Sequence, residues 1–302
     1  MSALGRGLYY FKYNQKRGWG AAWGEYVHGP KIHRWKIKKG ESNSVSLHTV
    51  GGHEQLLMAK WMIASWLELS GLDSPIFFHD DGSLTSQDEE ELQQLFPNLT
   101  VVWRESADEE MDRLLASFPK CREYRDRMPH GLKCFDVPFL NQEICEDKFL
   151  LVDPDVLFFK GPDFISEWCQ NDSDDTVWFN GEPKEPSIYE DEKLRGLLPF
   201  AFWKGVNSGL CLLRREMLSL DFFEECFGRE EFGKTKDWRV EQTLLALAGS
   251  RYGKGGILPR QYEISFGASR QKDAIARHYV GEVRSRLWAE GIPALSKRLT
   301  FH

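Results

Sequence analysis

Apolar residues along this chain change spacing regularly, from the continuous or alternating pattern of strands to the wider pattern of helices. Residues 44–50 predict a strand, and residues 53–70 then carry apolar side chains at helical spacing up to Gly71. The same patterns predict further strands over 75–79, 99–103, 148–153, 176–180, 209–213 and near 256–258, and helices over 85–95, 108–118, 133–145, 216–227 and 238–248. This alternation predicts an α/β fold, with a mostly parallel sheet covered by helices on both faces.

The amino-terminal residues 1–43 differ from the rest, because they are basic and aromatic and have no clear period. We expect an extension that packs on the body of a single domain formed by residues 44–302. A role of the extension in acceptor binding or at a membrane surface is less favoured, because the sequence shows no clean amphipathic face. No repeat, low-complexity segment or linker divides the remainder.

Composition narrows the possible classes of protein. With 41% hydrophobic residues, the 302-residue chain can bury a sizeable core, and its formal net charge of −7 argues against general nucleic-acid binding. None of the six cysteines forms a C-x-x-C pair, so we expect reduced thiols and a cytosolic setting. No apolar run is long enough for a membrane-spanning helix, and residues 1–20 lack the apolar core of a signal peptide.

The most informative segment is 149–159, an apolar run interrupted only by Asp153-Pro154-Asp155. Two carboxylates one residue apart in extended chain point the same way, so both can face one cation. Such a position, where a buried strand ends, is where open α/β sheets bind ligands. The ordinary alternative is a turn with two solvated aspartates.

A second pair, Asp172 and Asp174, has the same spacing but follows no buried strand. We therefore expect this pair to lie in a solvated loop.

Two polar groups precede apolar segments and are candidates for the same cleft. Asn207-Ser208-Gly209 allows a ligand to approach the backbone closely at the start of a predicted strand. Glu241 and Gln242 lie in the first turn of a predicted helix, where they could bind sugar hydroxyls or face a reacting carbon. Taken alone, each group is better explained as an ordinary turn or helix start.

Three further segments offer ligand-binding groups. His278 could complete a metal site begun by two aspartates, while Gly281 and Arg284 offer backbone access and a guanidinium to a phosphate. Without further context, a surface histidine in a polar loop is the better explanation of His278. Lys133, at the start of a predicted helix, could reach a phosphate or carboxylate in the cleft. Asp81 follows a strand end, where it could meet a nucleoside, although such tripeptides are usually turns.

In their order along the chain, these motifs resemble those of nucleotide-sugar glycosyltransferases of the GT-A fold, and most closely family 8, the glycogenin-like and galactosyltransferase-like enzymes. The resemblance covers roughly residues 44–292. It implies that Asp153, Asp155 and His278 bind Mn²⁺ or Mg²⁺, which holds the diphosphate of a UDP-sugar. Arg284 stands where the family has a lysine, followed by Ser285-Arg286 instead of Pro-Trp. The chain has Glu241-Gln242 where the family commonly has Asp-Gln.

The resemblance therefore implies transfer of a hexose from a UDP-sugar to a hydroxyl of a carbohydrate or other acceptor, with retention of configuration. Three alternatives stay open. An inverting enzyme would use Glu241 or Asp237 as its base. A nucleotidyltransferase would need a glycine-rich basic loop, whereas Gly51-Gly52-His53 stands after the first strand. A non-catalytic module would bind a nucleotide or nucleotide sugar without releasing UDP.

Overall fold

A seven-stranded sheet forms the centre of the computed structural model, which describes residues 17–36, 40–140, 147–183, 199–229, 232, 239–267 and 269–299. The strand order is β10-β8-β9-β6-β2-β4-β5. The strands are β2 (Ser46–Gly51), β4 (Ile76–Asp80), β5 (Leu99–Val102), β6 (Lys148–Val152), β8 (Val177–Gly181), β9 (Val206–Arg214) and β10 (Gly255–Ile257). Only β9 runs antiparallel to its two neighbours, and the other pairs of this sheet are parallel.

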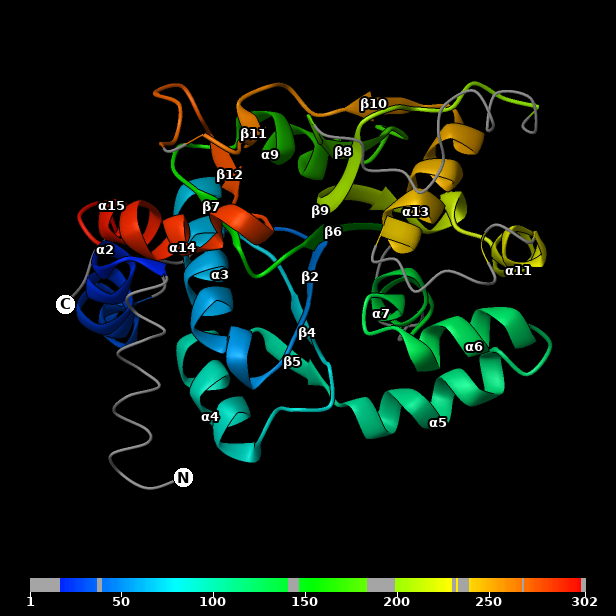
Figure 1. Cartoon of the computed structure of the whole chain (residues 1–302), viewed down its shortest axis with the longest axis horizontal. Helices are drawn as coiled ribbons and strands as arrows, with labels where there is room; N and C mark the ends of the chain where they lie inside the picture. Colours follow the sequence, from blue (N-terminus) through cyan, green and yellow to red (C-terminus); the bar gives the residue numbers. More distant parts are fainter. Residues whose placement is uncertain are drawn as a thin grey trace.

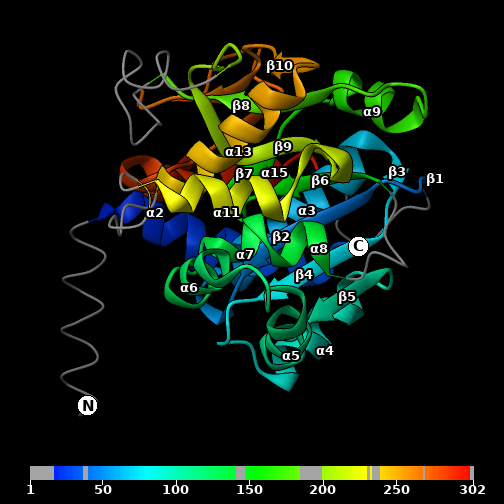
Figure 2. The same cartoon turned by 90° about the vertical axis from the view of Figure 1, so that its right-hand side faces the viewer.

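Helices cover both faces of this sheet, as Figures 1 and 2 show. One face carries α3 (Leu56–Ser70), α4 (Ser86–Leu95) and α9 (Asp163–Gln170). The opposite face carries α5 (Arg104–Leu114), α6 (Pro119–Arg127), α7 (Gly131–Cys134), α8 (Asp136–Phe139), η4 (Arg215–Met217), α11 (Leu220–Gly228) and α13 (Arg239–Tyr252). The predicted α/β architecture, with a mostly parallel sheet between helices, is confirmed.

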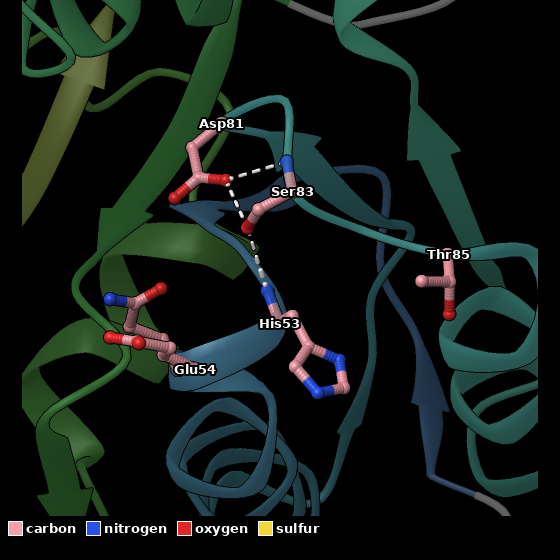
Figure 3. A pocket seen from close by; sticks show the side chains of 6 residues that line it. His53, Glu54, Asp81, Ser83 and Thr85 are labelled. Atoms are coloured by element: carbon pink, nitrogen blue, oxygen red, sulfur yellow. Dashed lines mark hydrogen bonds between the residues drawn. The ribbon is translucent and has the colours of Figure 1, made fainter. Parts of the chain in front are cut away.

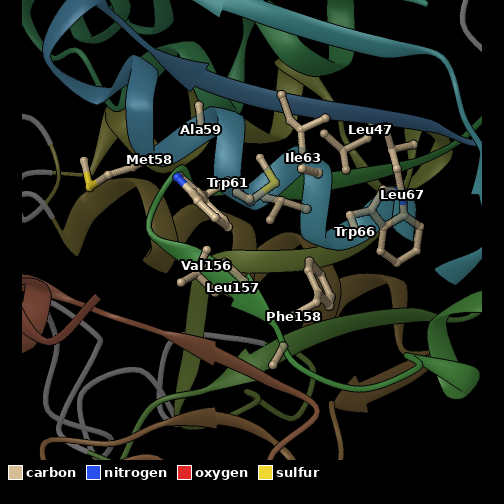
Figure 4. Close-up of a cluster of buried hydrophobic side chains, with 14 of the residues drawn as sticks. Leu47, Met58, Ala59, Trp61, Ile63, Trp66, Leu67, Val156, Leu157 and Phe158 are labelled. Atoms are coloured by element: carbon tan, nitrogen blue, oxygen red, sulfur yellow. The ribbon is translucent and has the colours of Figure 1, made fainter. Parts of the chain in front are cut away.

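The central strands divide their side chains between two hydrophobic clusters. Leu150 and Val152 of β6 belong to the cluster around α3, whereas Phe149 and Leu151 belong to the cluster around α13. Figure 4 shows the first cluster, in which Trp61 of α3 lies near residues of the segment that follows β6. Because both faces of these strands are buried, their sequences read as continuous apolar runs.

Two smaller sheets extend the structure. β7 (Val156–Phe158), β12 (Ala276–His278) and β11 (Tyr262–Ile264) form a three-stranded sheet in the order β11-β12-β7. In it, β12 runs antiparallel to β7 and parallel to β11. β1 (Glu41–Ser42) pairs in parallel with β3 (Leu72–Asp73).

Residues at the two ends of the described chain pack together. The segment 17–36 contains α2 (Trp19–Trp23), η1 (Gly24–His28) and η2 (Gly29–Arg34). It contacts the carboxy-terminal helical turns η6 (Leu287–Gly291) and α15 (Ile292–Leu295), chiefly through η6. Two shorter turns, η5 (Gly281–Val283) and α14 (Arg284–Arg286), precede them along the chain. Trp61 Nε1 also donates to the carbonyl of Gly29 at 3.0 Å, which ties η2 to α3.

Some predicted elements were wrong in extent. The helix expected over 108–118 begins at Arg104 and ends at Leu114, and a separate helix, α6, follows it. The helix expected over 133–145 is replaced by the short α7 and α8, because Pro138 has no N–H to continue the helical bonds. Its end, residues 141–145, lies outside the described residues. The short helices α6 and α9 and strand β12 had not been predicted.

Five cysteines within the described ranges are buried and free, as their spacing predicted. Cys145 lies outside those ranges, and the cytosolic setting stays a prediction. In the part of the chain that the structure describes, no helix has both the length and the apolar character needed to cross a membrane.

Candidate functional site

Strand pairing brings Asp153, Asp155 and His278 together. The chain leaves β6 at Val152 and turns at Asp153, whose carbonyl accepts from Val156 N at 3.1 Å as β7 begins. β12 pairs with β7 so that His278 stands opposite Val156. One residue further, Tyr279 N donates to the carbonyl of Asp155 at 2.9 Å.

One ligand atom from each of these three side chains lies within 4.8 Å of the others. His278 Nε2 is 3.0 Å from Asp155 Oδ1 and 3.7 Å from Asp153 Oδ2. Asp155 and His278 are buried, and Asp153 is partly exposed. Two carboxylates and one imidazole fit a divalent cation such as Mn²⁺, which accepts oxygen and nitrogen ligands.

The strand β9 orients the histidine. Its residue Asn207 presents Oδ1 at 3.1 Å from His278 Nδ1. When Nδ1–H donates to this oxygen, Nε2 keeps the lone pair that a metal needs. Gly209 lies directly against the ring, since a Cβ built there would be 2.1 Å from His278 Cε1. The predicted Asn-Ser-Gly segment therefore lies at this site.

Arg284 neutralises the buried end of the cluster. Its Nε donates to Asp155 Oδ2 at 2.8 Å. Burial opposes ionisation of Asp155, but His278 and Arg284 outweigh it and lower the pKa of this carboxyl to about 2. Asp155 is therefore an anion at neutral pH.

A second cluster of polar and charged side chains lies around Glu241, at the start of α13. Ser208 Oγ donates to Glu241 Oε2 at 3.0 Å, and Oε1 has no hydrogen-bond partner within the described residues. Lys133 Nζ lies 2.6 Å from Asp153 Oδ1 and 3.9 Å from Glu241 Oε1. Burial raises the pKa of Glu241 to about 7, aided by Asp153 and opposed by Lys133 and Ser208. Glu241 can therefore exchange a proton near neutral pH.

A cavity of about 800 Å³ adjoins these groups. Of the residues predicted from the sequence, it is lined by Lys133, Asp153, Asn207, Ser208, Glu241, Gln242, His278, Gly281 and Arg284. Asp155 and Gly209 contact lining residues from behind. Gln242 Oε1 accepts from Asn207 Nδ2 at 3.4 Å, so the amides of β9 and α13 meet at the cavity wall. Asp237 lies outside the described residues.

The sequence had not pointed to several other residues of the cavity wall: His130, Glu182, Arg239, Phe266, Val280 and Glu282. Some of them flank recognised motifs. Arg239 stands two residues before Glu241, and Val280 and Glu282 flank Gly281. Glu182 carries no such signal, because its place at the cavity follows from the pairing of β8 with β9. Its Oε2 accepts from Asn207 Nδ2 at 3.3 Å.

Asp81 lies in a different pocket, of about 400 Å³, where β2 and β4 end. Figure 3 shows that it bends towards its own turn: Asp81 Oδ1 accepts from Ser83 N at 3.0 Å and from Ser83 Oγ at 2.6 Å. Ser83 Oγ in turn accepts from His53 N at 3.0 Å. The structure thus does not bring Asp81 into the cavity of the metal cluster, and a nucleoside contact stays a prediction.

The aspartate pair expected to lie in a loop does so. Asp172 and Asp174 stand between α9 and β8, where Asp174 Oδ1 accepts from Thr176 N at 2.9 Å. Neither residue lines the cavity. The difference between this pair and Asp153/Asp155 is confirmed.

Comparison with solved structures shows which fold this is, although no protein-family model matches the sequence and no curated protein is significantly similar to it. The galactosyltransferase LgtC, in complex with donor and acceptor sugar analogues, superposes with a TM-score of 0.55 at 15% identity over 85% of this chain and 97% of LgtC. Mouse xyloside xylosyltransferase 1 superposes with a TM-score of 0.52 at 11% identity, over 81% of this chain and 99% of that protein. The bifunctional glycosyltransferase WbbM superposes with a TM-score of 0.51 at 10% identity, over 80% of this chain and 46% of WbbM. Membership of family 8 stays a prediction, whereas the fold of this chain is that of the GT-A glycosyltransferases.

Proposed function

We propose that this protein is a metal-dependent glycosyltransferase that transfers a hexose from a UDP-sugar to a hydroxyl of a carbohydrate or other acceptor, with retention of configuration. The observation that carries the proposal is the cluster of Asp153, Asp155 and His278 beside an 800 Å³ cavity, in a chain with the GT-A fold. LgtC, which has the same fold, was solved with donor and acceptor sugar analogues, and this supports a site for both substrates.

The metal cluster and Arg284 would bind the diphosphate. Asp153, Asp155 and His278 would hold Mn²⁺ or Mg²⁺, whose charge stabilises the UDP leaving group when the ion is bound. Among the described residues, Arg284 donates to Asp155 through Nε, so its terminal nitrogens can donate to phosphate oxygens. Lys133 balances Asp153 and Glu241 and keeps the acidic wall from repelling the donor.

The residues on the other side of the cavity would receive the sugar. Asn207, Glu241 and Gln242 offer amide and carboxylate groups that bind sugar hydroxyls and orient the anomeric carbon. In a retaining reaction the acceptor hydroxyl attacks from the face that UDP leaves. If the enzyme inverts instead, Glu241 is the base, because it is buried beside the cavity with a pKa of about 7. The anomeric configuration of the product, read by proton NMR, separates the two routes.

The decisive experiment measures release of free nucleotide from a panel of UDP-, GDP- and ADP-sugars, with Mn²⁺ or with excess chelator. We expect release from a UDP-sugar that requires the divalent ion. Asp153→Asn and Asp155→Asn should abolish it, while Asp172→Asn/Asp174→Asn, with the same spacing outside the cavity, should leave the rate within a few-fold.

Calorimetry with Mn²⁺ and UDP gives an independent measurement, since the two cluster variants should lose metal-assisted UDP binding. Full turnover in chelator would contradict the metal site. Pyrophosphate release would indicate a nucleotidyltransferase. Tight UDP-sugar binding without any release would indicate a binding module.

A further inference from the structure

The amino-terminal helical turns expose their large apolar side chains and bury their small ones, the reverse of what a surface helix usually does. Trp19, Trp23, Tyr26 and Val27 are exposed by 60, 62, 52 and 40% and form what we call the aromatic stripe. Their spacing of i, i+4, i+7 and i+8 places them on one helical face. A surface helix usually buries such a face. Here each of the three aromatic side chains is more than half exposed.

Small residues hold this segment to the body of the protein. Ala21, Ala22 and Gly24 are buried. A Cβ on Gly24 would lie 1.6 Å from the carbonyl oxygen of Trp288 in η6, so this backbone approach requires glycine. The close packing fixes the stripe outward, on the side of the molecule where Figure 1 shows α2 next to the carboxy-terminal helices.

Cations flank the stripe, in a protein whose net charge is −7. Residues 17–36 contain four lysines or arginines and one acid, Glu25, which pairs with Arg17. Directly after Val27, Lys31 Nζ lies 3.4 Å from His28 Nδ1. Burial and the charges of Lys31 and Lys297 lower the pKa of His28, so Lys297 of the carboxy-terminal turn shares this region.

We propose that the aromatic stripe and its flanking cations form a docking surface for an anionic phospholipid membrane, on which the protein lies without spanning it. Tryptophan and tyrosine favour the boundary between lipid headgroups and acyl chains, and lysine attracts anionic headgroups. A second copy fits this surface less well, because a twofold contact would place the cations Lys31 and Lys297 of both copies in one interface, where like charges repel. This surface was not evident from the sequence, because only the structure shows that residues 19–27 are helical and which side they expose.

Sedimentation of the full chain with vesicles tests this proposal without any donor or acceptor. Vesicles are made of phosphatidylcholine alone or of phosphatidylcholine and phosphatidylglycerol at 7:3. We expect binding to the mixed vesicles, weakened by high salt. Trp23→Ser/Tyr26→Ser should reduce the partition coefficient at least about ten-fold. The matched control is Leu114→Ser/Ile257→Ser, two residues that are each 37% exposed on other elements, and it should bind as the wild type does.

A second pair of variants tests the charges independently of the aromatic residues. Lys31→Glu/Lys297→Glu should remove the preference for phosphatidylglycerol, since each basic residue contributes about five-fold to binding. Lys254→Glu/Arg260→Glu, two exposed residues that precede and follow β10, should keep the preference. Unchanged circular dichroism confirms folding.

Three outcomes would overturn the proposal. The first is a wild type that sediments with neither vesicle, and the second is unchanged binding of both variant pairs. The third is a dimer, detected by light scattering, that Trp23→Ser/Tyr26→Ser converts to a monomer, which would make the stripe an interface between copies.

Discussion

Gly209 determines whether the His278 ring can lie beside Asp153 and Asp155. Because a Cβ at this position would lie 2.1 and 2.2 Å from ring atoms of His278, Gly209→Ala must displace the imidazole from Asp155. We expect Mn²⁺ affinity, measured by calorimetry with UDP, to fall by about 10–100-fold. Gly20→Ala is the control, since its Cβ would make only an ordinary 3.8 Å contact. Equal metal affinity in both variants would mean that His278 is not a ligand.

Arg284 is expected to act mainly on the departure of UDP. Its contact with phosphate should strengthen as charge develops, so Arg284→Ala should lower kcat by about 10²–10³-fold with a smaller change in donor KM. Arg284→Lys should recover part of the rate, because it keeps the charge but loses the planar fork. Arg286→Ala, an exposed arginine that does not line the cavity, serves as the comparison. A normal kcat for Arg284→Ala would refute the phosphate role.

Single residues were the part of the site that the sequence predicted best. Asp153, Asp155 and His278 have chemically distinctive side chains in distinctive local contexts, and the structure brings them together. Glu182 could not be predicted, because a lone acid in a polar loop has no local signal. Its position depends on pairing between β8 and β9.

Between elements, a buried ion pair fastens α6 to α8 around the short helix that carries Lys133. Arg125 Nε and Nη2 each donate to one carboxylate oxygen of Asp136 at 2.7 Å, and both side chains are 2% exposed. Asp136→Asn would remove the only fully buried counter-charge of the guanidinium among the described residues, leaving the more exposed carboxylates of Asp108 and Asp126. We expect a loss of about 3 kcal/mol in the free energy of unfolding, measured with urea.

Asp108 provides an internal control for this pair. Its carboxylate also accepts from Arg125, at 2.7 Å, but it is 45% exposed. Asp108→Asn should therefore cost less than about 1 kcal/mol. Similar losses in the two variants would show that burial does not set the strength of the Arg125–Asp136 contact.

Element boundaries were predicted less well than element types, for local reasons. The break between α7 and α8 depends on Pro138, whose effect is hidden in an otherwise apolar helical pattern. The eight residues of α9 are too few to establish a period. The pairing of β12 with β7, which brings His278 beside Asp153 and Asp155, joins distant segments of the chain and leaves no trace in either local pattern.

For the whole molecule, the central sheet buries two histidines that must stay neutral. His48 Nδ1 and His79 Nε2 are 2.9 Å apart on the adjacent strands β2 and β4, and His79 Nδ1 has no partner within the described residues. Burial lowers the pKa of His79 to about 3 and that of His48 well below its usual value. The free energy of unfolding should therefore depend on pH just below 6.5, a range in which most carboxylates keep their charge and contribute little to the pH dependence.

The direction follows from proton binding. Below pH 6.5 the unfolded chain protonates these histidines and the folded chain does not, so the free energy of unfolding falls from about pH 6.5 towards pH 3. Glu241 has the opposite effect, because its raised pKa of about 7 makes the folded chain bind a proton more readily than the unfolded chain. The wild type and His79→Gln both contain Glu241, so its contribution cancels when the two proteins are compared. Between pH 7.5 and 5.5, urea unfolding of the wild type should lose about 1.4 kcal/mol more than that of His79→Gln. Equal losses in the two proteins would show that His79 takes up its proton within the folded sheet, and that the sheet core is open to water at this position.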